Sequence, residues 1–382
     1  MFVKEVTLRH FRNLGCQSVA FCPGVNLIYG KNAQGKTNLL ESVFLLSCPK
    51  GFRQGRERDY IAFGEAAAKV LLRYQAFGRE QTLELSLFSD ARKSILLNGV
   101  SIRKNGELAS QFCTVLFEPG HLDLVKEGPE QRRHFLDTAI SQLRPKYQSA
   151  LESYSRVVAQ KNMLLKKNAG FSSGLPEMLA VWNEKLADLG SYITLQRGSY
   201  VRKLSAAAAA HHARLSHGKE TLFVEYRAFC GAPDEGLFTS LSELRRLLLQ
   251  QLEQALPLEI ERGMCMVGPH RDDMELLIDG RSARLFGSQG QQRSVVLSLK
   301  LGECELVEQT VGESPILLLD DVMSELDRAR QQYVRSSFGN RQVLITSCGR
   351  ARFSKKAAAF LVSGGTVTRL EAPKEDRPCT GA

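Results

Sequence analysis

The chain has 382 residues, a formal net charge of +10 and 43% hydrophobic residues, enough for roughly two or three lobes with apolar cores. No apolar run approaches the length of about 20 residues that spans a bilayer, and the N-terminus does not resemble a signal peptide. We therefore expect a cytoplasmic protein with no membrane partner. The excess of Lys and Arg favours an acidic partner, and nucleic acid is the first candidate.

The N-terminal third alternates strand patterns with one helix. Predicted strands lie at residues 2–8, 25–29, 70–74, 82–88 and 94–97, and the predicted helix lies at 36–46. The last of these strands ends in Asn98-Gly99, which is a hairpin signal because both residues tolerate a positive φ. These strands predict an antiparallel sheet beside the helix.

The middle of the chain is helical in period from residue 129 to about 216, with an interruption at 169–174 that lets two arms fold back on each other. Further strands are predicted at 222–226, near 260–267, at 316–319 and at 343–345, with helices at 291–311 and 327–338. We expect four segments: 1–128 and 257–370 as the two parts of one domain, 129–256 as a helical lobe, and 371–382 as a disordered tail.

A glycine-bounded loop follows the strand at 25–29. It consists of Gly30, Lys31, Asn32, Ala33, Gln34, Gly35, Lys36 and Thr37. This run fits G-x-x-x-x-G-K-[ST] between a strand and a helix, the context that phosphate binding requires. Its N–H groups and Lys36 would hold the phosphates of ATP, and the Thr37 hydroxyl would ligate Mg²⁺. The alternative is a chance glycine-rich turn.

Two carboxylates, Asp320 and Asp321, end the apolar strand at 316–319. We predict that Asp320 holds Mg²⁺ together with Thr37, and that Asp321 polarises the attacking water. With Lys36 they form the candidate catalytic set. An acidic pair at a strand end is otherwise a solvated turn, and the phosphate-binding loop favours the catalytic interpretation.

A third motif, with Ser288, Gly290 and Gln291, precedes the long helix at 291–311. A hydroxyl, a glycine and a helix N-terminus together can receive a γ-phosphate. The alternative is a polar helix cap, because Ser288 is a good N-cap residue. The order of phosphate-binding loop, signature and acidic strand is typical of ABC-type ATPases.

Five stretches resemble the RecF family of SMC-type ATPases: residues 8–14 (LRHFRNL), 127–137 (EGPEQRRHFLD), 267–273 (VGPHRDD), 288–293 (SQGQQR) and 317–327 (LLLDDVMSELD). The resemblance extends to about residue 370. It implies an α/β fold, an ABC-type ATPase head with mixed sheets and a P-loop α/β core, and an inserted helical lobe too short for a long coiled coil.

The resemblance also implies a function. Members of the family form an ATP-dependent homodimer, in which the signature meets the nucleotide of the other subunit. They bind double-stranded DNA and junctions with single-stranded gaps, and they assist RecR and RecO in loading RecA during repair, replication and the SOS response. Arg12 and Asn13 match a motif that touches nucleotide, although a solvated strand end is the alternative. Residues 324–327 resemble the D-loop.

Three departures from the wider ABC class predict slow hydrolysis. Asp321 stands in place of Glu, Thr346-Ser347 in place of the switch His, and Glu118 in place of the Q-loop Gln. Two other functions remain open: a transporter-type nucleotide-binding subunit, and an ATP-gated scaffold that binds RecR but barely hydrolyses ATP.

Candidate DNA contacts are the cationic positions at residues 50–58, Arg132, Arg133, Lys161, Lys166, Lys167 and Arg271. A charge run is usually a solvated face, so each position is weak by itself. We expect His270 to be a structural turn residue and His211 and His212 to be exposed helix positions.

Overall fold

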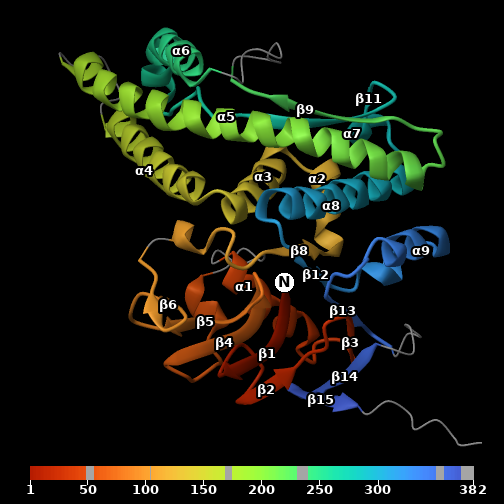
Figure 1. Ribbon diagram of the computed structural model, residues 1–382. Coiled ribbons are helices and arrows are strands. Elements are labelled where there is room, and N and C mark those ends of the chain that lie inside the picture. The colour runs from red at the N-terminus through yellow and green to blue at the C-terminus, as the bar shows by residue number, and fades with distance from the viewer. Residues whose placement is uncertain (49–55, 104, 168–173, 230–239, 350–356, 371–382) are drawn as a thin grey trace, which may run out of the picture. The chain divides into compact units, whose positions relative to one another are not determined.

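The structure is a computed structural model that describes residues 1–48, 56–103, 105–167, 174–229, 240–349 and 357–370 (Figure 1). The chain forms two compact units. The first comprises Met1–Arg103, Phe112–Pro119 and the chain from Glu313 on, and the second comprises Lys104–Gln111 and Gly120–Gly312. Residues 257–312, which we assigned to the ATPase head, thus belong to the second unit. The predicted segment boundaries remain a prediction, and the predicted tail lies outside the described residues.

A mostly parallel sheet of six strands in the order β15-β14-β3-β13-β12-β8 forms one layer of the first unit. Its strands are β3 (Val25–Tyr29), β8 (Thr114–Phe117), β12 (Ile316–Leu319), β13 (Val343–Ser347), β14 (Ala358–Ser363) and β15 (Thr366–Leu370). Only β15 runs antiparallel to its neighbour. Every residue of β8 and β12 is buried, as expected for the apolar runs of parallel strands. The carboxyl ends of β3, β13 and β12 therefore lie side by side, where such sheets bind ligands.

An antiparallel sheet in the order β2-β1-β4-β5-β6-β7 forms the other layer. Its strands are β1 (Phe2–Arg9), β2 (Gln17–Ala20), β4 (Ala67–Ala76), β5 (Arg79–Phe88), β6 (Ser94–Leu97) and β7 (Val100–Ser101). The predicted hairpin is confirmed, with φ of 51° at Asn98 and 79° at Gly99. Helix α1 (Lys36–Ser47) contacts β13 and β8 of the first sheet and β5 of the second, and it is buried almost all round.

The second unit is mainly helical. Its helices are α2 (Asp123–Lys126), α3 (Pro129–Leu143), α4 (Pro145–Lys167), α5 (Leu175–Leu215), α6 (Leu241–Arg262), α7 (Ala283–Phe286) and α8 (Gln289–Val311). Helix α5, green in Figure 1, has 41 residues and packs against α4, α6, α8 and the strand β9 (Leu222–Arg227). Strands β9, β10 (Asp273–Ile278) and β11 (Arg281–Ser282) form a small antiparallel sheet. Within the described ranges, no helix combines the length and apolarity needed to cross a membrane.

The prediction of a strand near 260–267 is wrong. Helix α6 occupies the first part of that segment and ends at Arg262, where Gly263 takes a left-handed φ of 67° as the C-cap. Leu244, Leu248 and Leu252 recur at four-residue spacing on the buried side of α6 and specify a helix. The strand itself, β10, begins ten residues later.

The helical region that begins at residue 129 has a break that the periodicity did not reveal. Helix α3 ends before Arg144, which is extended (φ −131°, ψ 100°) and precedes Pro145. The interruption predicted at 169–174 lies almost wholly outside the described residues. Helix α9 (Arg328–Ser336), in the first unit, confirms the helix predicted after the acidic strand.

Candidate nucleotide site and signature motif

The loop between β3 and α1 needs glycine at both ends. Gly35 has φ +112°, and a Cβ there would lie 2.8 Å from Asn13 Oδ1 and 2.9 Å from Leu14 Cδ2. A Cβ on Gly30 would lie 2.2 Å from the carbonyl oxygen of Val362. Neither position accommodates a side chain without a shift of its neighbours. The two glycines of the motif are thus required by the packing of their neighbours.

The β14–β15 hairpin, which the sequence analysis missed, holds this loop. The Gly364 N–H donates to Gln34 Oε1 at 2.7 Å, and the Gly365 N–H donates to the Gln34 carbonyl at 3.2 Å. The Gln34 amide in turn donates to the Asn32 carbonyl at 3.4 Å, and Ala33 takes a left-handed φ of 62°. These contacts give the loop a defined conformation before any ligand binds.

Lys36 folds back over the loop. Its Nζ donates to the carbonyl oxygens of Gly30 at 2.8 Å and Lys31 at 3.0 Å, and the residue is 7% exposed. A hydrogen bond from an ammonium group to an anion is stronger than one to a neutral carbonyl. A phosphate at this loop would therefore compete well for the Lys36 ammonium group.

Thr37 and Asp320 are in direct contact, although they lie far apart in the sequence. Thr37 Oγ1 donates to Asp320 Oδ1 at 2.9 Å, and Thr346 Oγ1 donates to the same oxygen at 2.8 Å. Mg²⁺ commonly binds through one or two carboxylates together with substrate phosphates. The hydroxyl of Thr37 and the carboxylate of Asp320 fit such a site beside the loop. No group of three or more His, Cys, Asp or Glu in the described ranges is arranged to hold a metal.

Asp321 adopts a left-handed conformation, with φ 52°. Such a conformation is uncommon for a residue with a side chain and is found often at functional sites. The Asp321 N–H donates to Thr346 Oγ1 at 2.9 Å, and Ser324 Oγ donates to Asp321 Oδ1 at 3.3 Å. The Cys348 thiol lies 3.6 Å from Asp321 Oδ2 and 3.0 Å from Asn32 Oδ1. One thiol thus connects the acidic turn with the glycine-bounded loop.

Thr346 and Cys348 are the site residues that the sequence analysis missed. We regarded the Thr346-Ser347 pair only as the absence of a switch His. In the sheet, β13 lies between β3 and β12, so polar residues at its carboxyl end must meet both motifs. A polar Thr directly after the apolar residues 343–345 was the available signal.

Asn13 and Arg12 have different surroundings. Asn13 lies against the loop, and its Oδ1 accepts from Asn38 Nδ2 at 2.8 Å. Arg12 instead donates from Nε to the fully buried Glu41 at 3.1 Å and stacks 4.7 Å from the centre of the Tyr60 ring. Burial and the Glu41 charge raise the pKa of Tyr60 to about 12, so the phenol under Arg12 is neutral.

The signature residues lie in the second unit, at the start of α8. Ser288 is the N-cap: its Oγ accepts from the Gln291 N–H at 3.2 Å, and its own N–H donates to Gln291 Oε1 at 2.8 Å. The Gly290 carbonyl accepts from Ser294 Oγ at 3.0 Å. The polar cap considered above is therefore present. It is compatible with phosphate binding, because a capped helix N-terminus still presents a positive dipole end.

Residues 324–327, which resemble the D-loop, also have structural partners. Ser324 donates to the Asp321 carbonyl at 2.6 Å. Asp327 caps α9 by accepting from the Arg330 N–H at 2.9 Å, and it forms an ion pair with the Arg330 side chain. The turn between the acidic strand and α9 is thus well defined.

Two of the cations proposed as DNA contacts are buried in ion pairs, so the prediction is wrong for them. Arg132 is 5% exposed and donates to both carboxylate oxygens of Asp273, at 2.6 and 2.9 Å. Lys161 is fully buried and pairs with Glu259 at 2.5 Å. Burying a charge requires such a partner, and neither side chain is free to reach a phosphate.

Two of the five stretches that carry the family resemblance, residues 127–137 and 267–273, meet in the interior of the second unit. Besides the Arg132 pair, Arg133 donates to the Asp272 carbonyl at 2.8 Å. Arg197 from α5 joins the stretches by donating to Asp137 Oδ1 at 2.8 Å and to the Pro269 carbonyl at 2.6 Å. These motifs therefore form a buried polar network that connects α3, α5 and the loop before β10.

His270 has a structural role in the same region of the second unit. Its Nδ1 lies 2.7 Å from the Tyr154 hydroxyl and its Nε2 lies 3.2 Å from the Cys265 carbonyl oxygen. Burial lowers the pKa of His270 to about 4, so the ring is neutral at physiological pH. The remaining candidate cations that are described and exposed are Arg56, Arg58, Lys166, Lys167 and Arg271. Residues 50–55 lie outside the described residues.

Comparison with known proteins shows which family the chain is similar to. Residues 2–366 match the family described as "RecF/RecN/SMC N terminal domain". The chain is 40% identical over 339 residues to the DNA replication and repair protein RecF of Symbiobacterium thermophilum, covering 88% of each chain. It is 38% identical over 347 residues to the RecF of Alkaliphilus oremlandii, covering 91% of this chain and 93% of the relative.

Solved structures are similar over the same length. A structure of the recombination mediator protein RecF with ATP, of the RecFOR pathway, superposes with a TM-score of 0.89 at 36% identity, covering 97% of this chain and 98% of the other. The Smc head domain from Pyrococcus furiosus gives a TM-score of 0.52 at 15% identity and covers 97% of this chain and 96% of the other. The expected α/β head fold with a helical insert is thereby confirmed.

Proposed function

Because the chain belongs to the RecF family of RecF/RecN/SMC ATPases, we propose that it is an ATP-dependent DNA-binding protein of recombinational repair and DNA replication. The observation that carries this proposal is the contact between Thr37 and Asp320 beside the glycine-bounded loop. It joins the two side chains that an ATPase of this class requires next to the phosphates.

The residues of the first unit have separate tasks in the proposed reaction. The N–H groups of residues 30–37 and the Lys36 ammonium group orient the triphosphate. Thr37 and Asp320 would hold Mg²⁺, which supplies charge neutralisation at the phosphate oxygens. Asp321 accepts a proton from the water that attacks the γ-phosphorus, and the bond to the bridging oxygen of ADP breaks. Slow turnover follows from the shorter carboxylate, which also accepts hydrogen bonds from Ser324 and Cys348.

The residues of the second unit complete the site in trans. Ser288, Gly290 and Gln291 of one subunit would receive the γ-phosphate of the nucleotide on the other subunit, so that ATP links a two-fold symmetric homodimer. Bound ATP then stabilises the dimer by mass action. Hydrolysis removes the shared phosphate and releases the subunits from each other and from DNA.

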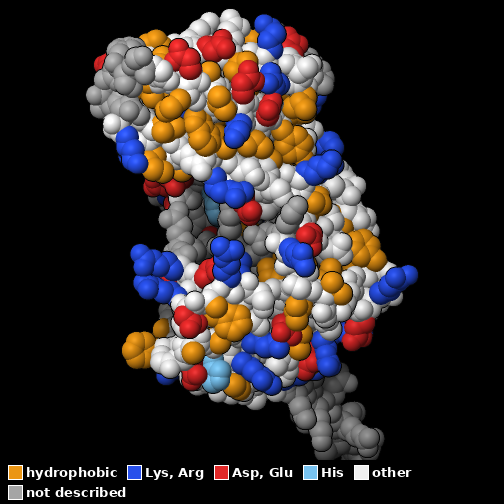
Figure 2. All heavy atoms as spheres, turned by 90° about the vertical axis from the view of Figure 1, so that its left-hand side faces the viewer, with side chains coloured by type: hydrophobic (Ala, Val, Ile, Leu, Met, Phe, Trp, Pro, Cys, Tyr) orange, Lys and Arg blue, Asp and Glu red, His pale blue; other side chains and the backbone are white. Residues whose placement is uncertain are grey.

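The proposed partners are double-stranded DNA, junctions with single-stranded DNA, and RecR, acting with RecO to load RecA in repair and the SOS response. The net charge of +10 supports a polyanionic partner. On the face drawn in Figure 2, Lys and Arg side chains stand among acidic ones instead of forming one uninterrupted patch. DNA affinity should therefore fall steeply with salt, and the dimer should bind more tightly than the monomer because it carries twice the charge. A cytoplasmic location accords with these partners.

The proposal is tested by light scattering in ATP and in ADP, with and without duplex DNA, combined with turnover. Lys36→Met should lose ATP binding. Asp321→Asn should bind ATP, stop hydrolysis and accumulate as a dimer that stays on DNA. Ser288→Arg should bind ATP as a monomer but neither dimerise nor hydrolyse.

The matched control for the last variant is Ser240→Arg. Ser240 is the N-cap of α6 and accepts from the Glu243 N–H at 3.3 Å, so its loss costs a comparable helix cap without touching the signature. An Asp321→Asn protein that remains monomeric in ATP, or a Ser288→Arg protein that turns over like Ser240→Arg, would contradict the shared site. Normal dimerisation and DNA binding without turnover in the wild type would favour the ATP-gated scaffold.

A further inference from the structure

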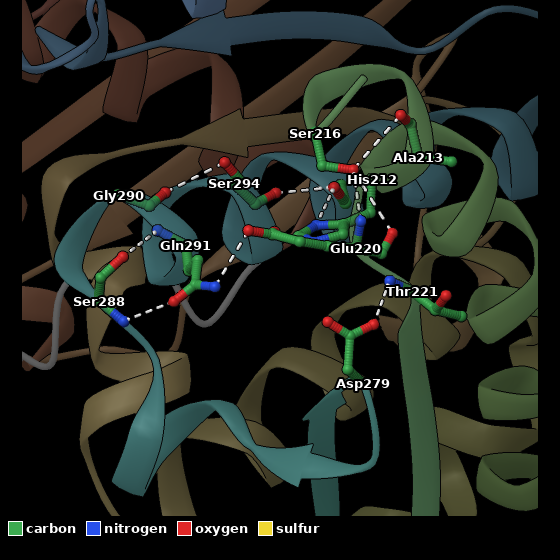
Figure 3. Close-up of polar contacts among 11 residues, drawn as sticks. His212, Ala213, Ser216, Glu220, Thr221, Asp279, Ser288, Gly290, Gln291 and Ser294 are labelled. Atoms are coloured by element: carbon green, nitrogen blue, oxygen red, sulfur yellow. Dashed lines mark hydrogen bonds and ion pairs between the residues drawn. The ribbon is translucent and has the colours of Figure 1, made fainter. Parts of the chain in front are cut away.

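The signature turn is connected by side chains to a buried histidine (Figure 3). Gln291 Nε2 donates to Glu220 Oε1 at 3.0 Å, and the other oxygen of Glu220 pairs with His212 Nε2 at 3.0 Å. His212 belongs to α5 and is fully buried, and Glu220 lies in the loop between α5 and β9. The prediction that His212 is an exposed helix position is therefore wrong. It is equally wrong for His211, which is 6% exposed and pairs with Glu305 at 2.9 Å.

Glu220 determines the orientation of the Gln291 amide. A carboxylate only accepts hydrogen bonds, so it selects the rotamer in which the NH₂ group of Gln291 faces Glu220. Gln291 Oε1 then faces the Ser288 N–H, where it accepts at 2.8 Å. The capping interaction between the two signature residues thus depends on the charge of Glu220. If the amide turned over, its NH₂ group would face the Ser288 N–H, and this half of the reciprocal cap would be lost while the bond from the Gln291 N–H to Ser288 Oγ remained.

Glu220 is itself held on two sides. Its N–H donates to Ser216 Oγ at 3.3 Å, which closes the turn at the end of α5. The next residue, Thr221, exchanges hydrogen bonds with Asp279: the Thr221 N–H donates to Asp279 Oδ1 and the Asp279 N–H donates to the Thr221 carbonyl, both at 2.9 Å. Asp279 belongs to the β10–β11 turn, and that hairpin leads into α7 and the signature. The loop of Glu220 and the signature therefore share one anchor.

The contacts return to the signature through α8. His212 Nδ1 lies 3.5 Å from Ser298 Oγ, and Ser298 donates to the Ser294 carbonyl at 2.7 Å. Ser294 donates in turn to the Gly290 carbonyl at 3.0 Å. The Ser298 hydrogen is used in α8, so the side of its oxygen that remains open faces the His212 ring. His212 thus lies between Glu220 on one side and α8 on the other.

We propose that Glu220, held by His212, is a positioning residue for the nucleotide site of the partner subunit. It fixes the Gln291 side chain, and through it Ser288 and the first turn of α8, in the arrangement that receives the γ-phosphate. Donors that are oriented before the ligand arrives need no reorganisation when charge develops on it. The inference rests on the proposed function, because it concerns the signature acting on a second copy of the chain.

The test compares Glu220→Ala with the control Glu305→Ala, each made in the full-length chain and studied in the presence of ATP. Both variants remove the carboxylate that pairs with a buried histidine of α5. Glu305 lies in α8, far along the helix from the signature, and contacts His211 instead of His212. Glu220→Ala should leave the affinity of the monomer for a fluorescent ATP analogue unchanged, since the phosphate-binding loop is in the other unit. It should weaken ATP-dependent dimerisation and lower turnover about tenfold or more, the value of a hydrogen bond to a charged group. Glu305→Ala should change neither.

A charge swap separates positioning from a loss of fold. Gln291→Glu keeps the capping box, in which Glu and Gln are equivalent, but sets two carboxylates against each other and should weaken dimerisation like Glu220→Ala. The double variant Gln291→Glu with Glu220→Gln places an amide donor opposite a carboxylate again, and it should recover most of the dimer. A structural role alone would not predict this recovery.

The outcomes distinguish the positioning role of Glu220 from the shared nucleotide site on which it rests. Dimerisation of Glu220→Ala equal to that of Glu305→Ala, or a double variant no better than Gln291→Glu, would overturn the positioning role. Normal dimerisation by Ser288→Arg would instead overturn the shared site on which the role rests. If Glu220→Ala cannot be purified folded, the comparison of Gln291→Glu with the double variant decides the question.

Discussion

Thr346 connects the two acidic residues of the candidate site, and Thr346→Val tests whether that connection matters. The side chain is 1% exposed, donates to Asp320 Oδ1 at 2.8 Å and accepts from the Asp321 N–H at 2.9 Å. Valine has nearly the same shape but can make neither hydrogen bond. The left-handed Asp321 would then lose the acceptor that holds its backbone in place.

The size of the effect follows from these two contacts. A hydrogen bond to a charged group contributes about 1.5–3 kcal/mol, and a buried N–H without a partner costs about 1–3 kcal/mol. Because Asp321 can relax out of its left-handed conformation, which costs about 1–3 kcal/mol by itself, part of the loss is recovered. We expect the free energy of unfolding to fall by about 2–3 kcal/mol, and turnover to fall by about tenfold or more because relaxation displaces the carboxylate of Asp321.

Urea unfolding, ATP binding and turnover should be measured on Thr346→Val and on the control Thr346→Ser, which keeps the hydroxyl. The serine variant should keep most of the turnover and stability. Binding of ATP should survive in both variants, because the phosphate-binding loop itself is unchanged. A Thr346→Val protein that unfolds at the wild-type urea concentration and hydrolyses ATP at the wild-type rate would refute the reasoning.

Three further predictions concern other parts of the chain. Gly35→Ala should abolish ATP binding, because its Cβ collides at the loop, whereas Gly24→Ala, where nothing lies within 4 Å, should bind normally in the same titration. Lys161→Ala should lower the free energy of unfolding by about 3–5 kcal/mol by leaving Glu259 buried and unpaired, and urea unfolding should show Lys161→Ala with Glu259→Leu to be more stable than the single variant. The pKa of His270 is about 4 when folded against an ordinary 6.5, so the unfolded state takes up the proton first as the pH falls. Stability should therefore decline from pH 6.5 to 4, and a His270→Gln variant with the wild-type slope would contradict this.

Much of the first unit could be predicted from its sequence because its motifs are local. The phosphate-binding loop, the acidic strand end and the Asn98-Gly99 hairpin each depend on neighbouring residues and on backbone conformations that only a few residue types adopt. The contact between the glycine-bounded loop and the acidic strand end could also be predicted, since parallel strands bring their carboxyl ends to one edge.

The parts that were missed depend on contacts distant in sequence. Nothing near Val362 or Gly364 indicates that this hairpin packs on the loop at residues 30–37, because the hairpin makes these contacts with its own backbone atoms. Helix α6 was missed for a different reason. Its apolar side is a narrow row of Leu residues within a charged sequence, and the alternation near residue 260 favoured a strand over the C-terminal turn of that helix.

The local sequence pattern of a helix distinguishes its buried cations from its exposed ones, which amino-acid composition alone cannot do. In α4 the buried positions include Leu151, Tyr154, Val157, Lys161 and Leu165, which recur at the spacing of one helix face. Lys161 lies on that apolar side, and a cation there must have a buried partner, which Glu259 provides. Lys166 and Lys167 follow Leu165 on the solvent side and are exposed. Cations off the apolar side of a helix are therefore the ones to examine for DNA binding, and a count of Lys and Arg overestimates the surface that DNA can use.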